Sequence, residues 1–306
     1  MGVGIGEGAG PVRIGVLSES WGTPTATFGL RERLRELGYR ENTDFVIGVR
    51  FTQGDPTALS AAAKELIALG VDLLFVEELN AAKALHAATK KIPIVFAGVS
   101  TPLEEGLITS FAKPGGNVTG VTQLDLDLAP KRLEVFRDLF PGLRRVLFPY
   151  PAGDRHAVKE AEAYREAGRK LGILLVERPL QTMDEARTTL AGIRTGEVDG
   201  ALAPHHSSWN IPGFLLDATR SNRIPTMFES AFWVKQGGFA SYGPDYHETG
   251  RDAGRLVDKI LKGATPGLIP VEVNRRIRFT INLRVARALG LSIPPAALVR
   301  VDEVVE

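Results

Sequence analysis

Two distant segments of the chain share one pattern. Residues 92–120 read IPIVFAGVSTPLEEGLITSFAKPGGNVTG, and residues 236–295 contain QGGFASYGPDYHETGRDAGRLVDKILKG followed by FTINLRVARALGLSIPP. Each segment begins in an apolar strand of the kind that is buried, continues through glycines and prolines, and then returns to regular secondary structure. A strand that crosses from one lobe to another needs this pattern. The two segments therefore predict a pair of lobes joined by a hinge of several strands, with a cleft between them.

Short apolar runs alternate with stretches of helical periodicity in the first part of the chain. Residues 12–17 read VRIGVL, and Phe28, Leu30 and Leu34 follow at helical spacing. The unit recurs three times, so we expect strands at 12–17, 45–50, 73–76 and 94–99, and helices at 27–37, 56–69, 81–89 and 103–111. Strands that alternate with helices of this length indicate a mostly parallel sheet covered on both faces.

The pattern starts again after Gly120. We expect strands at 145–148, 174–177, 200–203 and 225–228, and helices at 156–171, 183–193 and 211–221. A helix at 248–261 is expected to return to the first lobe. The sequence therefore predicts an α/β protein with two doubly wound, Rossmann-like lobes. The expected lobes are residues 12–121 plus 244–268 and residues 122–243 plus 269–306.

Composition excludes several classes of function. The chain has 306 residues, is 44% hydrophobic, and carries 37 Lys and Arg against 36 Asp and Glu. This balance provides no long-range field for nucleic acid or an anionic membrane surface. The absence of cysteine excludes disulfides, thiolate metal sites and cysteine nucleophiles. The first eleven residues contain no apolar run typical of a signal or a spanning helix, so either an export signal has been removed or the protein stays in the cytoplasm.

No catalytic motif stands out. The chain lacks a phosphate-binding G-x-x-x-x-G-K-[ST], a G-x-S-x-G elbow and an H-E-x-x-H helix. The glycines of MGVGIGEGAG precede the first strand, which is the wrong place for a dinucleotide loop. Adjacent His205 and His206 point in different directions and have no acidic neighbour to complete a metal site. We expect a binding protein with no cofactor and no metal, and not an enzyme.

Four segments of the chain carry a family resemblance. They are GLITSFAKPGGNVTGVT (106–122), LAPKRLEVFRDLFPGLRRV (128–146), residues 237–272, and FTINLRVARALGLSIPPAALVRVDEVVE (279–306). Together they resemble the tryptophan/tyrosine-type substrate-binding proteins of ABC importers, and the likeness extends from Arg13 to Glu306. The resemblance implies a type I periplasmic-binding-protein fold, an extracytoplasmic location, and delivery of an amino acid or aromatic compound to the permease subunits of an ABC transporter.

The ligand site can be placed from topology. In open parallel sheets, ligands bind beyond the carboxyl ends of the strands. The residues there that we expect to bind ligand are Ser18, Ser20, Trp21, Thr23, Glu77, Glu78, Asn80, Ser100, Thr101, Gln123, Tyr150, His205, Glu229, Tyr242 and Asp245. The partners expected are a small-molecule ligand and the permease subunits, with no nucleic acid, no direct membrane span, and a monomeric state.

Glu77 and Glu78 depart from the family pattern. Family members usually carry Gly-Thr/Ser-Pro at this strand end, and small residues there can present backbone N–H groups to a carboxylate. A pair of glutamates would repel a carboxylate, so a glutamate that points into the cleft favours an amine, hydroxyls or another cationic group. The alternative is that one glutamate faces solvent and stabilises the positive end of the following helix.

Several other candidates also have a structural alternative. Trp21 and Tyr242 are candidates for stacking on a planar ligand, or for lobe packing and a hinge hydrogen bond, respectively. His205 can bind ligand directly, with capping by Ser207 or Ser208 as the alternative. Asp154 and Glu229 can each pair with a ligand amine or act as a cap or surface charge.

Two other classes of protein share this bilobed plan. A cytoplasmic ligand-sensing domain is one, although the helix-turn-helix module that precedes such domains in repressors is missing from this chain. A non-cysteine enzyme is the other, because the usual two-cysteine racemases are excluded by composition.

Overall fold

The computed structural model describes residues 10–20, 22–123, 125–205 and 208–306. The chain folds into two compact units, the first made of residues 1–124 and 245–275, and the second of residues 125–244 and 276–306. The chain therefore passes from one unit to the other three times. Each unit contains a single sheet with helices packed on it, so the α/β class predicted from the sequence is confirmed.

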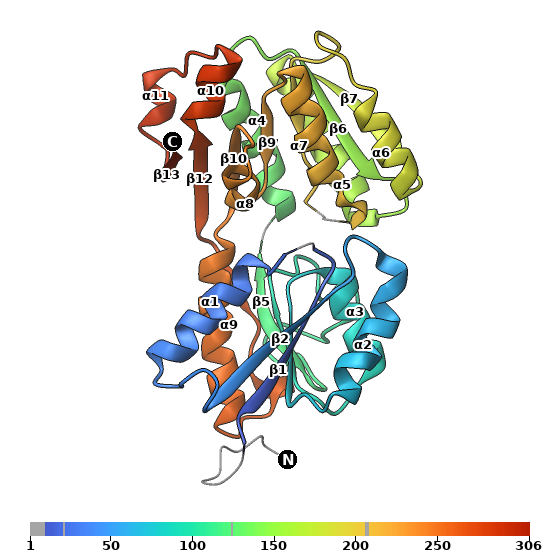
Figure 1. The fold of residues 1–306 in the computed structure, drawn as a ribbon, viewed down its shortest axis with the longest axis vertical. Coiled ribbons are helices and arrows are strands. Elements are labelled where there is room, and N and C mark those ends of the chain that lie inside the picture. The colour runs from blue at the N-terminus through green and yellow to red at the C-terminus, as the bar shows by residue number, and fades with distance from the viewer. Residues whose placement is uncertain (1–9, 21, 124, 206–207) are drawn as a thin grey trace. The chain divides into compact units, whose positions relative to one another are not determined.

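The first unit, which contains the strands labelled β1, β2 and β5 in Figure 1, has a six-stranded parallel sheet in the order β11-β5-β4-β3-β1-β2. Its strands are β1 (Val12–Ser18), β2 (Phe45–Phe51), β3 (Leu73–Val76), β4 (Ile94–Ala97), β5 (Val118–Gln123) and β11 (Glu272–Asn274). Its helices are α1 (Thr25–Glu36), α2 (Leu59–Ala68), α3 (Leu79–Ala88) and α9 (Tyr246–Leu261), with 3-10 turns η1 (Pro56–Ala58) and η3 (Pro266–Leu268). Because β11 pairs with β5, this sheet extends beyond residue 268, where the sequence-based division ended the first lobe.

Burial explains why the central strands read as continuous apolar runs. All four residues of β3 and all four residues of β4 are buried. Parallel strands covered by helices on both faces have no solvent side, so they show no polar alternation. The apolar runs at 73–76 and 94–99 therefore predicted these strands from the sequence alone.

Helix α9 packs against α1 through glycines. A Cβ atom built on Gly29 would lie 2.0 Å from the carbonyl oxygen of His247, and one built on Gly250 would lie 1.9 Å from the carbonyl oxygen of Ala26. Only glycine allows two helix backbones to approach this closely. Arg251 adds an ion pair across the same contact, with its Nη1 atom 2.8 Å from Glu32 Oε1. These contacts hold the returning segment in the first unit.

The second unit repeats the strand order of the first. Its sheet runs β13-β12-β10-β9-β8-β6-β7, so β7-β6-β8-β9-β10 corresponds to β2-β1-β3-β4-β5. Its strands are β6 (Arg145–Pro151), β7 (Leu174–Leu180), β8 (Gly200–Leu202), β9 (Thr226–Phe228), β10 (Ala240–Pro244), β12 (Ile277–Asn282) and β13 (Glu303–Val305). Its helices are α4 (Asp125–Leu139), α5 (Arg155–Leu171), α6 (Met183–Ala191), α7 (Ile211–Asn222), α8 (Ala231–Lys235), α10 (Leu283–Leu289) and α11 (Pro295–Leu298), with the 3-10 turn η2 (Ser208–Asn210). Strand β12 is antiparallel to β10, which fits the expected mostly parallel sheet.

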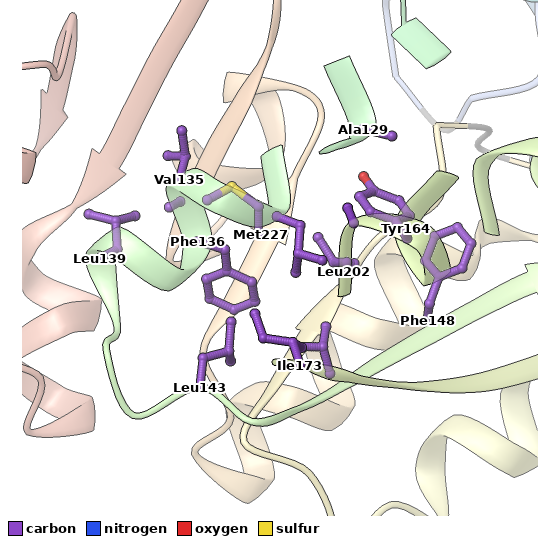
Figure 2. Packing of buried hydrophobic residues seen from close by; sticks show 14 of the residues in the cluster. Ala129, Val135, Phe136, Leu139, Leu143, Phe148, Tyr164, Ile173, Leu202 and Met227 are labelled. Carbon is purple, nitrogen blue, oxygen red and sulfur yellow. The ribbon is translucent and has the colours of Figure 1, made fainter. Parts of the chain in front are cut away.

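Aromatic and aliphatic side chains pack together in a core cluster of the second unit (Figure 2). The rings of Phe148 and Tyr164 meet edge to face with centroids 5.0 Å apart. Phe136 of α4 lies over β8, where a Cβ atom on Gly200 would be 2.7 Å from its ring. Glycine at this strand position therefore leaves room for the phenylalanine, as close packing of a core requires.

The helix expected at 103–111 is absent, and the prediction was wrong. The segment forms turns in which the Pro102 carbonyl oxygen accepts hydrogen bonds from the backbone N–H groups of Leu107 and Ile108, at 2.9 and 3.3 Å. Gly106 adopts a φ of +69°, which ends any helical turn. Leu107 and Ile108 are both buried, so their apolar character reflects a loop packed on the core and not the face of a helix.

Candidate functional site

Predicted site residues of the first unit gather at one edge of its sheet. Ser18 ends β1, Glu77 and Glu78 directly follow β3, and Gln123 ends β5. These strands are parallel and lie in the order β5-β4-β3-β1, so their carboxyl ends meet at the same edge. We call Ser18, Glu77, Glu78 and Gln123 the first-unit rim.

Ser18 and Glu78 form the centre of this rim. The Ser18 hydroxyl is fully buried, donates a hydrogen bond to Glu78 Oε1 at 2.8 Å, and lies 2.8 Å from the Ser20 hydroxyl. The backbone N–H of Ser20 also donates to Ser18 Oγ at 3.1 Å. The second carboxyl oxygen of Glu78 is buried and has no hydrogen-bond partner among the described residues. Glu78 therefore has one oxygen fixed by the protein and one oxygen open to a further donor.

Glu77 has a different role from its neighbour. Its Oε1 atom accepts hydrogen bonds from the backbone N–H of Thr27 at 3.0 Å and from the Thr27 hydroxyl at 3.4 Å. Glu77 thus stabilises the first turn of α1, where N–H groups lack partners within the helix. The alternative predicted from the sequence was that a glutamate stabilises the N-terminus of the helix that follows, which is α3. Glu78 occupies the N-cap of α3 but makes no capping hydrogen bond there.

Burial changes the acidity of both glutamates. Desolvation and the neighbouring carboxyl of Glu78 raise the pKa of Glu77 well above its ordinary value of 4.5. Desolvation and the nearby carboxyl of Glu19 raise the pKa of Glu78 from 4.5 to about 8. Both effects disfavour the charged form of a carboxyl group. A cation placed at the rim would reverse them by stabilising the carboxylate.

Gln123 completes the rim from the end of β5. The side chain is 1% exposed, and its Nε2 atom donates to the Tyr246 hydroxyl at 3.3 Å. Its Oε1 atom is buried and has no hydrogen-bond partner among the described residues. The side-chain amide lies over Gly98, because a Cβ atom on Gly98 would be 3.2 Å from both Oε1 and Nε2.

The other candidates of the first unit lie around this rim, and one has a structural role. Thr23, Asn80, Ser100 and Thr101 are partly buried. Trp21 lies outside the described residues. Asp245 caps α9, since its side chain accepts the N–H of Glu248 at 3.2 Å and its carbonyl oxygen accepts from the Thr249 hydroxyl at 2.9 Å.

Candidates of the second unit also follow strand ends. Tyr150 lies in β6, and its hydroxyl donates to Glu177 Oε2 at 3.1 Å. Glu229 directly follows β9 and is 7% exposed. A Cβ atom on Gly243 of β10 would lie 1.9 Å from the carbonyl oxygen of Glu229, so the backbones are in close contact there. The Tyr242 ring contacts Phe279 with centroids 6.0 Å apart.

Asp154 and His205 occupy different surroundings in the same unit. Asp154 caps α5 by accepting the N–H groups of His156 and Ala157 at 2.8 and 3.2 Å, as its structural alternative predicts. The backbone N–H of His205 donates to Glu160 Oε2 at 3.1 Å, and its ring lies 5.4 Å from that of His156. His205 therefore belongs to a polar group that includes residues absent from the candidate list.

That polar group is centred on Arg132, which the sequence reasoning missed. Arg132 is fully buried, and its Nη1 atom lies 3.1 Å from Glu160 Oε1 and 2.7 Å from the Tyr164 hydroxyl. Its Nε atom donates to the carbonyl oxygen of Tyr242 at 2.7 Å. A sequence signal existed, because Arg132 falls on the apolar face of α4, four residues before Phe136. A charged residue on such a face needs a buried partner.

The comparison with protein families is decisive for identity. A model described as ABC transporter substrate binding protein matches residues 12–305. The chain belongs to this family of ABC transporter substrate-binding proteins. The resemblance drawn from the sequence is thereby confirmed. Among the described residues of this substrate-binding protein, no helix is both long and apolar enough to cross a lipid bilayer.

Individual relatives agree with the family match. A tyrosine-binding protein of Clostridioides difficile (strain R20291) is 27% identical over 268 residues, which are 86% of this chain and 76% of that protein. A Streptococcus pneumonia structure, described as an ABC domain in complex with L-Trp, is 27% identical, covers 95% of this chain and 100% of its own, and has a TM-score of 0.80. A conserved domain protein of Vibrio cholerae O1 biovar El Tor (strain N16961) is 26% identical, with coverages of 96% and 99% and a TM-score of 0.83. The predicted type I periplasmic-binding-protein fold is confirmed.

Proposed function

We propose that this substrate-binding protein is the extracytoplasmic component of an ABC importer, that it binds an amino acid or a related small aromatic compound, and that it delivers this ligand to permease subunits. The observation that carries the proposal is the 27% identity, along 95% of the chain, to a protein solved with L-Trp. The tyrosine-binding relative supports the same class of ligand. The protein acts as a monomer and performs no chemistry on its cargo.

The proposed mechanism is closure of two lobes about a hinge. The three passages of the chain between the units are the segments that would bend. Closure is favoured only by contacts that the ligand makes in the closed form and lacks in the open form. A ligand that binds one unit alone therefore shifts no equilibrium, however tightly it binds.

The proposed ligand contacts come from both units. The first-unit rim supplies Ser18, Glu78 and Gln123, because these polar groups end neighbouring parallel strands. The second unit supplies His205, Glu229 and Tyr242, which follow or lie in strands of its own sheet. Asp154 is left out because its carboxylate already caps α5.

Isothermal titration calorimetry tests the function directly. We expect L-tryptophan or L-tyrosine to bind with one site per chain, and solution scattering to show a smaller radius of gyration after saturation. NMR of the ligand after long incubation should show it unchanged. Conversion of the amino acid would instead assign an enzyme, and failure of aromatic amino acids to bind would refute the proposed class of cargo.

A further inference from the structure

Two acceptor oxygens at the first-unit rim lack donors. Glu78 Oε2 and Gln123 Oε1 are both buried, and neither has a hydrogen-bond partner in the part of the chain that the structure describes. Native proteins rarely leave buried polar atoms unpaired, because each such atom has lost its hydrogen bonds to water without replacement. Gln123 Oε1 is an acceptor, and Glu78 Oε2 becomes one when the carboxyl ionises, so a group rich in donors would satisfy both atoms.

The two residues lie at the same edge of the sheet, with one strand between them. Gln123 ends β5 and Glu78 follows β3, and β4 lies between these strands. The Gln123 amide lies over Gly98, just beyond the end of β4, so the side chain reaches from β5 toward β3. Gly98 has a φ of +106°, which residues other than glycine rarely adopt. Glycine at this position therefore leaves room for the Gln123 side-chain amide over the end of β4.

The remaining polar groups of the rim are already engaged. Glu77 is held by the backbone and hydroxyl groups of Thr27, and Ser18 is hydrogen-bonded to Glu78 Oε1. No lysine or arginine of the described residues forms an ion pair with Glu77 or Glu78. Within the described part of the chain, the rim thus carries two carboxyl groups and no fixed cation beside Glu78, so it offers no counter-charge to a carboxylate group of a ligand.

We propose that Glu78 and Gln123 form a subsite for a primary ammonium group, so that the ligand enters the first unit with its amine and not with its carboxylate. An ammonium group has three donors and a positive charge, and it can satisfy both acceptors at once. This inference rests on the proposed function, because it names the chemical end of the cargo that the first unit holds.

The experiment is a cycle of protein variants and ligand analogues. Calorimetry would measure L-tryptophan, tryptamine and indole-3-propionate, and in parallel L-tyrosine, tyramine and 3-(4-hydroxyphenyl)propionate, on the wild type and on Glu78→Gln. We expect Glu78→Gln to weaken the amine-bearing compounds about 10- to 100-fold, the usual effect of a lost charged hydrogen bond. The propionates, which lack the amine, should bind the two proteins within about threefold of each other, because they bring no ammonium group for the Glu78 side chain to hold.

Two further variants make the test specific. Gln123→Met keeps the length of the side chain and removes the acceptor, so it should weaken the amine-bearing compounds about 3- to 10-fold. Glu65→Gln changes a glutamate of the same unit whose side chain is 56% exposed, and it should change none of the affinities. Circular dichroism would verify that each variant is folded.

The possible outcomes separate this inference from the proposed function. If the propionates bind the wild type as tightly as the amines, or if Glu78→Gln weakens amines and propionates equally, the ammonium subsite is wrong while the binding function stands. If none of the six compounds binds, the proposed class of cargo is wrong, and the subsite inferred from it is refuted as well.

Discussion

Replacing Glu78 by glutamine is expected to make the ligand-free protein more stable at alkaline pH than the wild type. Burial and Glu19 raise the pKa of Glu78 from 4.5 to about 8 in the folded protein. Between these values the folded state holds a proton that the unfolded chain releases, so the free energy of unfolding falls as the pH rises. Glutamine is always neutral, and the variant therefore lacks this loss.

The size of the effect follows from the same two values. At about 1.36 kcal/mol for each pH unit, a change from 4.5 to about 8 sets an upper limit of about 5 kcal/mol. Only part of this free-energy change occurs between pH 5.5 and 8. Water also screens the charge of Glu78, because the side chain is partly exposed. We expect the stability difference between Glu78→Gln and the wild type to grow by about 2 kcal/mol across that range.

Urea unfolding followed by circular dichroism at several pH values measures this difference. Glu77 also titrates from a raised pKa, but it is present in both proteins, and removing the charge of Glu78 can only lower the pKa of Glu77. Glu65→Gln is the control, and its stability should follow the wild type across the pH range. Parallel pH profiles for Glu78→Gln and the wild type would show that Glu78 is not the buried, protonated group described here.

Three other predictions concern different parts of the protein. Binding of L-tryptophan at pH 7.5 should release protons, because an ammonium at the rim lowers the pKa of Glu78. Calorimetry in buffers of different ionisation enthalpy would detect the released protons. Equal binding heats in all buffers would contradict the prediction. Gly250→Ala should destabilise the protein by about 2–4 kcal/mol in urea unfolding, because the added Cβ would meet a carbonyl oxygen of α1. Gly48→Ala is the control and should cost little, because no atom lies within 4 Å of its Cβ. Equal losses of stability in the two variants would refute the close contact. Glu160→Gln should cost about 3–5 kcal/mol, because it removes the carboxylate that pairs with the buried Arg132 guanidinium at 3.1 Å, and a loss under about 1 kcal/mol would show that this pair contributes little.

Local patterns were enough to establish the architecture of this protein. The apolar runs that became β3 and β4 are buried along their whole length, and a strand covered on both faces leaves this mark in a sequence. The alternation of such runs with helical periods led to the parallel sheets, and parallel sheets led to their carboxyl edges as the place to look for a site. The segment 103–111 misled this reasoning because two adjacent buried residues, Leu107 and Ile108, resemble part of a helical face.

The division of roles between Glu77 and Glu78 required the folded structure. The two residues are adjacent and chemically identical, yet one meets the first turn of α1 and the other meets Ser18 of β1. Arg132 likewise gains its partners, Glu160 and Tyr164, from a helix about 30 residues later in the chain. The spacing of apolar residues indicates which residues of a helix or strand are buried, because the buried face recurs with the period of that helix or strand. It carries no information on which side chains from distant segments meet, and those meetings decide the charge and hydrogen-bonding capacity of the rim.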